Sequence, residues 1–329
     1  MKVKVGVVGL GFMGSAHARV YKKLNNCELV AICDSDPTKK ELADSYNCKF
    51  CSDLSTFLEQ DLDAVSVCTP TSMHHDVVSA VLDAGKHVLV EKPFADSLTK
   101  GESLVKKAIE ADKLLGVGYI ERFNSAVRSL KELLDCSQIF STVSMRFGPF
   151  PPRTKYSGVF LDLASHEIDL LNYLFGEVPK VLYAHFSSKI NNNFEDYAYI
   201  SLKYGHIHSH IEASWLPNYK VRQISLYANE RFYSLNYAQQ KLKMYRAPPK
   251  ANIVTGNWED ILWLSRHINE EIPVSVGEPL LMELQCFVDS VKQNELLDPL
   301  CSPQEALNVL KVTDCAFRKA KVKTGCENQ

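Results

Sequence analysis

The sequence predicts an α/β domain with a doubly wound parallel sheet, followed by an α+β domain built on a large, mostly antiparallel open sheet. Strand patterns alternate with helix patterns over residues 1–120, which is typical of a parallel sheet. Over residues 121–329 most strand patterns are separated only by turn residues, which favours antiparallel pairing. The chain has 329 residues, enough for two such domains.

The composition excludes several classes of protein. The hydrophobic content of 46% and the charged content of 23% are ordinary for a folded globular chain. A net charge of -2 argues against a nucleic-acid partner, and no apolar run approaches the ~20 residues of a membrane-spanning helix. The first residues run directly into a strand pattern without a signal peptide, and several cysteines lie in apolar runs. We therefore expect a cytoplasmic protein.

The first strand pattern ends in a glycine-rich turn, and a helix pattern over residues 15–24 follows it. A G-x-G-x-x-G sequence between a strand and a helix is the dinucleotide-binding fingerprint of a Rossmann domain. Its glycines allow a tight turn, close approach of a pyrophosphate and close helix packing, while the helix N-terminus attracts the phosphates. The residues expected to contact the cofactor here are Gly9, Gly11, Phe12, Met13 and Gly14.

The second strand pattern, residues 28–34, ends in Asp34. A carboxylate at this position can accept hydrogen bonds from the adenosine ribose diol and repels a 2′-phosphate. No arginine follows Asp34 closely, so we expect NAD as the cofactor rather than NADP. NADP remains the alternative cofactor because Lys39 and Lys40 follow Asp34.

The alternation continues through helix patterns at residues 37–46, 75–84 and 98–111 and strand patterns at 63–68 and 114–119. These predict a sheet of about six strands. The carboxyl ends of its strands should line the ligand crevice. At the end of the strand over 63–68, the residues expected to line the cofactor site are Thr69, Pro70, Thr71 and His74. For His74, an exposed position at a helix start is an equal alternative.

The apolar run Val88-Leu89-Val90 predicts a buried strand that stops at Glu91-Lys92-Pro93. Proline has no N–H group to donate to a central ladder, so the strand ends there. Glu91 and Lys92 should then lie at the cofactor site, with the ammonium group of Lys92 directed toward a small-molecule substrate. The alternative is a surface lysine at a strand end.

The second half predicts a helix over residues 124–134 and two more over residues 278–292 and 303–320. Its strand patterns cover residues 138–147, 178–187, 194–204, 206–216, 221–228 and 230–237. Turn residues rather than helices separate most of these strands, which indicates a mainly antiparallel sheet.

A helix pattern over residues 158–171 contains Asp162, His166 and Asp169 at i, i+4 and i+7, on one helix face. Burying carboxylates and an imidazole costs several kcal/mol unless they are paired. Even a neutral polar group costs roughly 2–7 kcal/mol when it is buried without a hydrogen bond. A carboxylate one turn from a histidine can orient its ring and raise its basicity. The alternative is a solvated polar stripe on a surface helix.

Two patterns suggest metal ligands. Cys48 and Cys51 form a C-x-x-C, but no second pair lies at zinc spacing. His206, His208 and His210 would share one strand face, about 7 Å apart, which is too far to converge on one ion. We therefore expect no metal. The better interpretation of the histidines is a polar sheet face covered by another subunit, in a homodimer or homotetramer.

Taken together, these motifs resemble the glucose–fructose oxidoreductase / inositol dehydrogenase / MocA family. The resemblance covers nearly the whole chain and includes the glycine motif with His17 downstream, Thr69-Pro70-Thr71 with His74, Glu91-Lys92-Pro93, and Asp162-x-x-x-His166. It implies a Rossmann domain followed by an open sheet, and NAD(P)-dependent oxidation of a hydroxyl group. It also implies that Lys92, Asp162 and His166 are catalytic.

Residues 118–124 and 146–153 look like those of family members that oxidise UDP-N-acetylglucosamine at its 3-hydroxyl, although Ser125 stands where that subgroup often has proline. Besides the catalytic trio, the candidate substrate contacts are Arg122, Asn124 and Arg153. An arginine fork suits a diphosphate, and a salt bridge at the domain interface is the alternative. Other possible substrates are inositols and free sugars.

The implied reaction passes a hydride to the nicotinamide while a side chain takes the hydroxyl proton. Either His166 or Lys92 could be that proton acceptor. A sensor that binds NAD without catalysis is the alternative from another class of protein. Such a sensor should have lost part of the trio, and Lys92, Asp162 and His166 are all present.

Overall fold

The computed structural model describes residues 2–151, 158–190, 193–246 and 268–324, except for the side chains of residues 268 and 321–324. The chain divides into two compact units. Unit 1 comprises Met1–Phe123 and Glu278–Asp314, and unit 2 comprises Asn124–Gly277 and Cys315–Gln329. The predicted first domain ended at residue 120 and did not include residues 278–314. Those residues join unit 1 because their first helix packs on its opening helix and strand.

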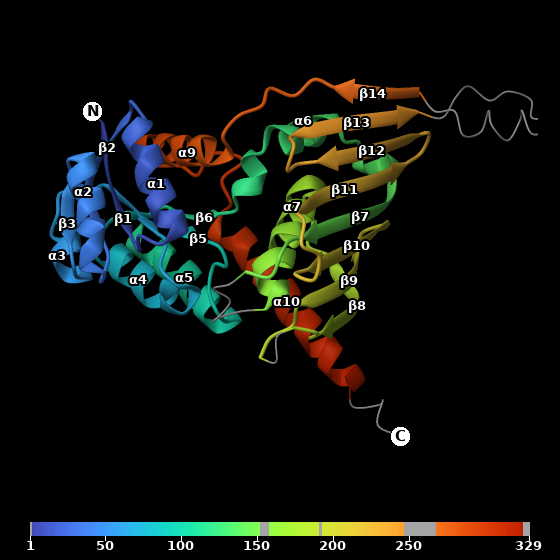
Figure 1. Ribbon diagram of the computed structural model, residues 1–329, viewed down its shortest axis with the longest axis horizontal. Helices are drawn as coiled ribbons and strands as arrows, with labels where there is room; N and C mark the ends of the chain where they lie inside the picture. Colours follow the sequence, from blue (N-terminus) through green and yellow to red (C-terminus); the bar gives the residue numbers. More distant parts are fainter. Residues whose placement is uncertain (1, 152–157, 191–192, 247–267, 325–329) are drawn as a thin grey trace, which may run out of the picture. The chain divides into compact units, whose positions relative to one another are not determined.

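Unit 1 contains a six-stranded, wholly parallel sheet in the order β3-β2-β1-β4-β5-β6 (Figure 1), as the alternating pattern predicted. Its strands are β1 (Val3–Val8), β2 (Cys27–Cys33), β3 (Lys49–Cys51), β4 (Ala64–Val67), β5 (His87–Glu91) and β6 (Leu115–Gly118). Its longer helices are α1 (Phe12–Lys23), α2 (Lys40–Tyr46), α4 (Thr71–Asp83), α5 (Leu98–Ala111), α9 (Pro279–Gln293) and the first half of α10 (Pro303–Thr324).

The core of unit 1 joins segments that lie far apart in the sequence. Val5 of β1 is fully buried, and Leu284 and Phe287 of α9 belong to the same apolar cluster. Burying a side chain of this kind contributes about 1.5–3 kcal/mol. Helix α9 is therefore an integral part of the unit that carries the glycine-rich turn.

Some elements of unit 1 differ from their predicted bounds. Helix α1 begins at Phe12 rather than residue 15, because Gly11 already serves as its N-cap. Helix α4 begins at Thr71 rather than residue 75, with Pro70 as its N-cap. The prediction missed β3 and the short helix α3 (Leu54–Leu58), because elements of three and five residues show no clear period.

Unit 2 contains an eight-stranded sheet in the order β14-β13-β12-β11-β7-β10-β9-β8 (Figure 1). Its strands are β7 (Ile139–Phe147), β8 (Lys180–Ser187), β9 (Tyr197–Tyr204), β10 (Ile207–Ser214), β11 (Val221–Ala228), β12 (Arg231–Asn236), β13 (Lys241–Arg246) and β14 (Ile268–Ile272). Only the β7–β10 pair is parallel, so the mostly antiparallel prediction is confirmed. Strands β13 and β14 were not predicted.

The two faces of this sheet differ. On β7, Thr142, Ser144 and Arg146 are buried, and the π-helical turn η4 (Phe160–Ala164) contacts β7, β9 and β10. Helix α7 (Ser165–Phe175) continues from η4, and α6 (Ser125–Leu133) contacts β12 and β13. At other positions of the sheet, aromatic side chains form a row across the four strands β7, β11, β12 and β13. It consists of Phe140, Tyr227, Phe232 and Tyr245, with ring centroids 5.1–6.5 Å apart.

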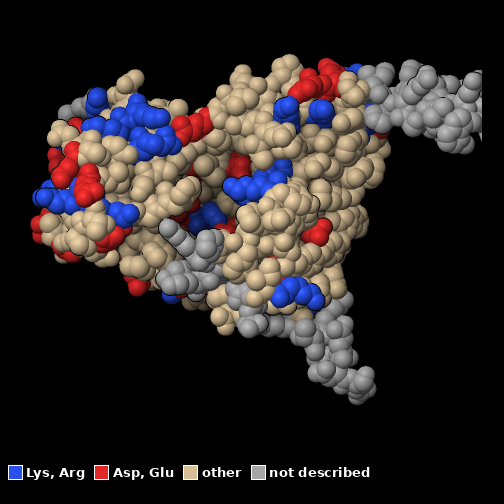
Figure 2. Space-filling view, viewed as in Figure 1, with Lys and Arg blue, Asp and Glu red and all other residues tan. Residues whose placement is uncertain are grey.

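None of the helices in the described part of the chain is long and apolar enough to cross a membrane. On the face shown in Figure 2, basic and acidic side chains are interspersed over unit 1. Such a mixture differs from the continuous basic surface that a phosphate backbone requires.

Candidate active site

Each glycine of the turn after β1 meets a different geometric requirement. Gly9 has φ +86°, and a Cβ atom there would lie 2.8 Å from the backbone of Cys68 and Thr69. A Cβ atom on Gly14 would lie 1.7 Å from the carbonyl oxygen of Gly9. A Cβ atom on Gly11, in contrast, would meet nothing within 4 Å. The turn therefore leaves open space at Gly11, beside the N-terminus of α1, where a pyrophosphate can approach the backbone.

The next two residues of the motif begin α1. Phe12 is 83% exposed, which is unusual for a large aromatic side chain, whereas Met13 is half-buried against the core. An aromatic ring left in solvent beside the open turn can cover a bound cofactor. Contact of Phe12 and Met13 with the cofactor stays a prediction.

Asp34 follows β2 and is tied to the glycine-rich turn. Its Oδ2 atom accepts a hydrogen bond of 2.6 Å from the Leu10 N–H group, and its Oδ1 atom accepts one of 2.9 Å from the Asp36 N–H group. Each carboxylate oxygen has a further lone pair. Asp34 can therefore accept from a ribose hydroxyl while it holds the turn in place.

Two adjacent strand ends are linked through His74. Thr69 and Pro70 follow β4, Thr71 begins α4, and the ring of His74 is buried beneath this turn with 1% exposure. Its Nε2 atom lies 2.9 Å from the carbonyl oxygen of Thr69, and its Nδ1 atom lies 2.8 Å from that of Pro93. The alternative of an exposed position for His74 is therefore wrong.

Glu91, the last residue of β5, belongs to a buried cluster. Its Oε1 atom lies 3.0 Å from Nε2 of His17 on α1. Glu283 of α9 brings a third ligand-type atom within 4.8 Å of these two, and all three residues are buried. Two carboxylates in a dry interior require a balancing proton or cation. The His17–Glu91 contact links the β5 strand end to α1.

Lys92 follows this cluster directly and is half-buried in unit 1. Asp162 and His166 lie in unit 2. Each unit thus contributes part of the predicted trio, and the meeting of the three side chains remains a prediction.

The sequence pattern over residues 158–171 forms two kinds of helix. Asp162 lies in η4, whose wider π-helical turn uses i→i+5 hydrogen bonds, and His166 lies in the first turn of α7. That Asp162 and His166 share one helix face stays a prediction. His166 and Asp169 are buried, at 6% and 1% exposure, so the alternative of a solvated stripe is wrong. Asp162 is half-buried.

A polar network beneath α7 was not predicted. The carboxylate of Glu167, fully buried next to His166, accepts hydrogen bonds from Ser144, from Arg146 Nη1 at 3.1 Å and from the Tyr237 hydroxyl at 2.5 Å. A buried charge with several donors is strongly held in one orientation. The sequence signal was a glutamate within a helix whose other faces are apolar. Its partners lie on β7 and after β12, which no local pattern indicates.

The start of η4 is held by Glu195. Its Oε1 atom accepts a hydrogen bond of 3.2 Å from the Phe160 N–H group, and its backbone carbonyl accepts one of 2.9 Å from Val159. A Cβ atom on Gly158 would lie 2.0 Å from the same carboxylate. Burial raises the pKa of Glu195, against the hydrogen bonds that lower it. Gly158 is therefore required for the carboxylate to cap this turn.

The three further candidates for substrate contact differ in their surroundings. Arg122 is buried and its Nη1 atom lies 2.9 Å from Glu305, so this salt bridge lies within unit 1 and is not the domain-interface pair named as the alternative. Asn124 caps α6 by accepting from the Ala126 N–H group and donates a hydrogen bond of 2.8 Å to the Tyr237 carbonyl oxygen. Arg153 lies outside the described residues. Substrate contact stays a prediction for all three.

The patterns weighed for metal binding are arranged as follows. Strand β10 begins at Ile207, so His206 lies in the preceding turn and only His208 and His210 lie in the strand. His210 Nδ1 lies 2.9 Å from the Tyr199 hydroxyl. Within the described ranges, the one group of three or more metal-ligand side chains close enough to share an ion is the His17, Glu91 and Glu283 cluster.

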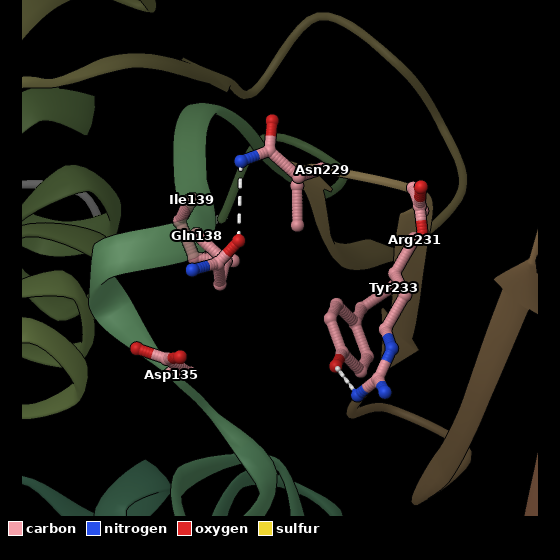
Figure 3. Close-up of a pocket in the computed structure, with 8 residues that line it drawn as sticks. Asp135, Gln138, Ile139, Asn229, Arg231 and Tyr233 are labelled. Carbon is pink, nitrogen blue, oxygen red and sulfur yellow. Dashed lines mark hydrogen bonds between the residues drawn. The ribbon is translucent and has the colours of Figure 1, made fainter.

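A hollow of about 660 Å³ lies elsewhere in unit 2, at the start of β7 and the β11–β12 turn (Figure 3). It is lined mainly by polar side chains, among them Asp135, Asn229 and Arg231. Asn229 donates to Gln138 and Arg231 to Tyr233, as Figure 3 shows. None of the predicted site residues lines it.

Models of two known protein families match this chain. The model for the "Oxidoreductase family, NAD-binding Rossmann fold" matches residues 3–119, and that for the "GFO/IDH/MocA C-terminal domain" matches residues 140–231. The chain belongs to the Gfo/Idh/MocA family. It is therefore an NAD(P)-dependent dehydrogenase of this family, which acts on hydroxyl groups.

Relatives of this Gfo/Idh/MocA protein act on different substrates. A UDP-N-acetylglucosamine 3-dehydrogenase of Acidithiobacillus ferrooxidans is 27% identical over 74% of this chain and 77% of its own. A myo-inositol 2-dehydrogenase of Thermotoga maritima is 31% identical over 55% of this chain, and the match spans less than two thirds, 58%, of the relative. The solved structure of the Acidithiobacillus enzyme GnnA has a TM-score of 0.85, covers 98% of both chains and is 22% identical, which shows a shared fold.

The residues of unit 1 fit the NAD(P) that this family binds. The open space at Gly11, the exposed Phe12 and the carboxylate of Asp34 surround one end of the parallel sheet. They would hold the pyrophosphate, cover the cofactor and contact the ribose, respectively. When bound, the nicotinamide supplies the acceptor for a hydride.

Proposed function

We propose that this protein oxidises a secondary hydroxyl of a sugar or nucleotide sugar with NAD, and that UDP-N-acetylglucosamine, oxidised at C3, is its substrate. The observation that carries the proposal is the position of Lys92. It directly follows the buried Glu91 at the carboxyl end of β5, in the domain that binds NAD(P). This is the edge of a parallel sheet where ligands bind.

The preference for NAD over NADP rests on Asp34. Its carboxylate is fixed by the Leu10 and Asp36 N–H groups, so it cannot swing away from a 2′-phosphate without losing both hydrogen bonds. A fixed negative charge repels a phosphate and accepts from a 2′-hydroxyl.

In the proposed reaction, His166 accepts the hydroxyl proton and Asp162 orients its ring. Lys92 stabilises the alkoxide that develops as the C–H hydride leaves. The reverse assignment, with Lys92 as the proton acceptor, uses the same three side chains. The burial of His166 and the anchoring of the adjacent Glu167 support an ordered imidazole.

The choice of a nucleotide sugar is supported by the name of the Acidithiobacillus relative and by residues 118–124 and 146–153. Arg122, Asn124 and Arg153 are the proposed substrate contacts on these segments. Of these, Arg153 is the proposed partner of the diphosphate. Its substitution by alanine should raise the KM for UDP-sugars, and an unchanged KM would contradict this role.

The experiment that tests the function is the formation of NADH, followed by near-ultraviolet absorbance, with NAD and a panel of UDP-sugars, inositols and free hexoses. We expect turnover with a UDP-sugar, and a loss of about 10²–10⁴-fold in kcat for Lys92→Ala and His166→Ala. The pH profiles of the two variants distinguish the two proton acceptors. Unchanged turnover in both variants would contradict the site assignment.

An inositol dehydrogenase is the second candidate, favoured by the Thermotoga relative at 31% identity. The same panel separates the two substrate classes. Absence of turnover with every compound would favour an NAD-binding sensor instead.

We also propose that the protein forms a homodimer or homotetramer through the face of the unit 2 sheet that carries the aromatic row. The aromatic row of this face includes Phe140, which is 51% exposed, and Tyr227, which is 39% exposed. Exposed contiguous aromatic surface of this kind commonly marks a protein–protein interface.

A further inference from the structure

We propose that His74 is a positioning residue whose ring joins the turn that carries Lys92 to the turn that follows β4, with one donated hydrogen bond when the ring is neutral and two when it is protonated. The importance of Lys92 rests on the proposed function. The contacts of His74 do not depend on that function.

The geometry is that of a bridge between two carbonyl oxygens. Nδ1 of His74 lies 2.8 Å from the oxygen of Pro93, the residue after Lys92. Nε2 lies 2.9 Å from the oxygen of Thr69, at the end of β4. The ring is 1% exposed, so water does not compete for either nitrogen. One side chain thus connects two neighbouring strand ends that border the cofactor site.

The protonation state of the ring decides how many of these contacts are hydrogen bonds. A carbonyl oxygen only accepts, and a neutral imidazole carries one N–H group. The imidazolium form carries two, so it alone donates to Pro93 and Thr69 together. In the neutral form, one nitrogen lone pair faces a carbonyl lone pair, and that turn loses its attachment.

The surroundings of the His74 ring shift its pKa in opposite directions. Burial lowers the pKa of His74, while the two carbonyl groups and the carboxylate of Glu91 on β5 act to raise it. The charged groups of the nearby helices pair elsewhere. Lys100 of α5 pairs with Asp96, and His75 of α4 pairs with Asp76. The net direction is downward, so the bridge gains its second hydrogen bond only as the pH falls below the usual range of histidine titration.

Three variants separate positioning from mere packing. His74→Gln keeps an amide donor but cannot titrate, and His74→Phe keeps a buried ring but removes both donors. His75→Gln is the matched control, since His75 neighbours His74 in α4 but bonds to Asp76 and Ser103 instead. For each protein, the dissociation constant of NAD is measured by calorimetry between pH 4 and pH 8. Thermal unfolding by circular dichroism confirms that each variant is folded.

We expect NAD to bind the wild type and His75→Gln more tightly as the pH falls through the titration of His74, by roughly three- to tenfold. His74→Gln should bind NAD with no such pH dependence, and His74→Phe should bind it most weakly. A pH dependence shared unchanged by the wild type and His74→Phe would overturn the proposal.

Nitrogen NMR of the histidine-labelled protein provides a readout that needs neither NAD nor substrate. We expect both ring nitrogens of His74 to carry protons at the acid end of the range and one at the alkaline end. A single neutral tautomer throughout would overturn the proposal. If the wild type binds NAD but oxidises no sugar, the proposed substrate is wrong while both measurements still test the bridge.

Discussion

The hydroxyl group of Tyr237 donates a hydrogen bond of 2.5 Å to Oε1 of Glu167, the residue that follows His166 in α7. Asn124, the N-cap of α6, in turn donates to the backbone carbonyl of Tyr237. Two helices and the segment after β12 are therefore coupled at the position of the predicted proton acceptor. This connection leads to the first prediction.

Tyr237→Phe should impair catalysis as well as folding. The change removes one donor from the buried carboxylate of Glu167, which should cost about 1–3 kcal/mol. If half of this loss falls on the alignment of His166, kcat drops by roughly two- to thirteenfold. Steady-state kinetics at several pH values measures the effect. Tyr204→Phe is the matched control, because the Tyr204 hydroxyl donates to Asn172 at the other end of α7. Equal losses of kcat in both variants would contradict a specific role for Tyr237.

Asp34 should determine cofactor choice by charge as well as by hydrogen bonding. Asp34→Asn keeps an acceptor for the Leu10 N–H group but removes the charge that repels a 2′-phosphate. We expect the ratio of the NADP and NAD dissociation constants to fall by about tenfold, equivalent to about 1.4 kcal/mol. Asp34→Ala also frees the glycine-rich turn, so it should weaken both cofactors, and NAD more. A wild type that binds NADP more tightly than NAD would refute the interpretation of Asp34.

Glu195 should make unit 2 less stable as the pH rises. Because its pKa is raised in the folded protein, the folded state binds more protons than the unfolded state between the ordinary value, 4.5, and the raised value. Stability therefore falls as the pH rises through that window. Glu195→Gln keeps an acceptor for Phe160 and removes the charge. Its Tm at pH 7 should rise by about 2–4 °C, as expected for about 1 kcal/mol.

The measurement for Glu195→Gln is thermal unfolding as a function of pH. The difference from the wild type should shrink toward pH 4, where the carboxyl group is protonated in both states. Gly158→Ala serves as the opposite case, since its Cβ atom would displace the Glu195 carboxylate. It should lower the Tm at every pH. A lower Tm for Glu195→Gln at pH 7 would show that the charge stabilises the turn.

The aromatic row of the unit 2 sheet should form the contact between subunits. Tyr227→Lys places a charge at its centre, and we expect the assembly to dissociate at micromolar concentration. Sedimentation velocity distinguishes an oligomer from a 37.0 kDa monomer. Ile109→Lys is the control, because Ile109 is 75% exposed on α5 of unit 1 and is not part of this sheet. A wild type that sediments as a monomer would rule out the assembly.

The sequence by itself determined those helices, strands and functional residues that depend on a short segment of the chain. The strand, glycine turn and helix around Gly11 share one short segment, and α5 was predicted at its observed bounds, Leu98–Ala111. Backbone sterics and hydrophobic period act over a few residues, so they can be read along the chain. The motifs that identify the family, including Lys92 and His166, have the same local character.

Only the tertiary structure decided which distant groups meet. Local patterns do not show that Glu167 receives donors from Arg146 and Tyr237, or that α9 completes the core of unit 1. The bridge from His74 to Pro93 is equally invisible, because sequence separation carries no information on contact across a sheet edge. Burying a polar group requires a partner, and that partner is chosen by the packing of the whole unit.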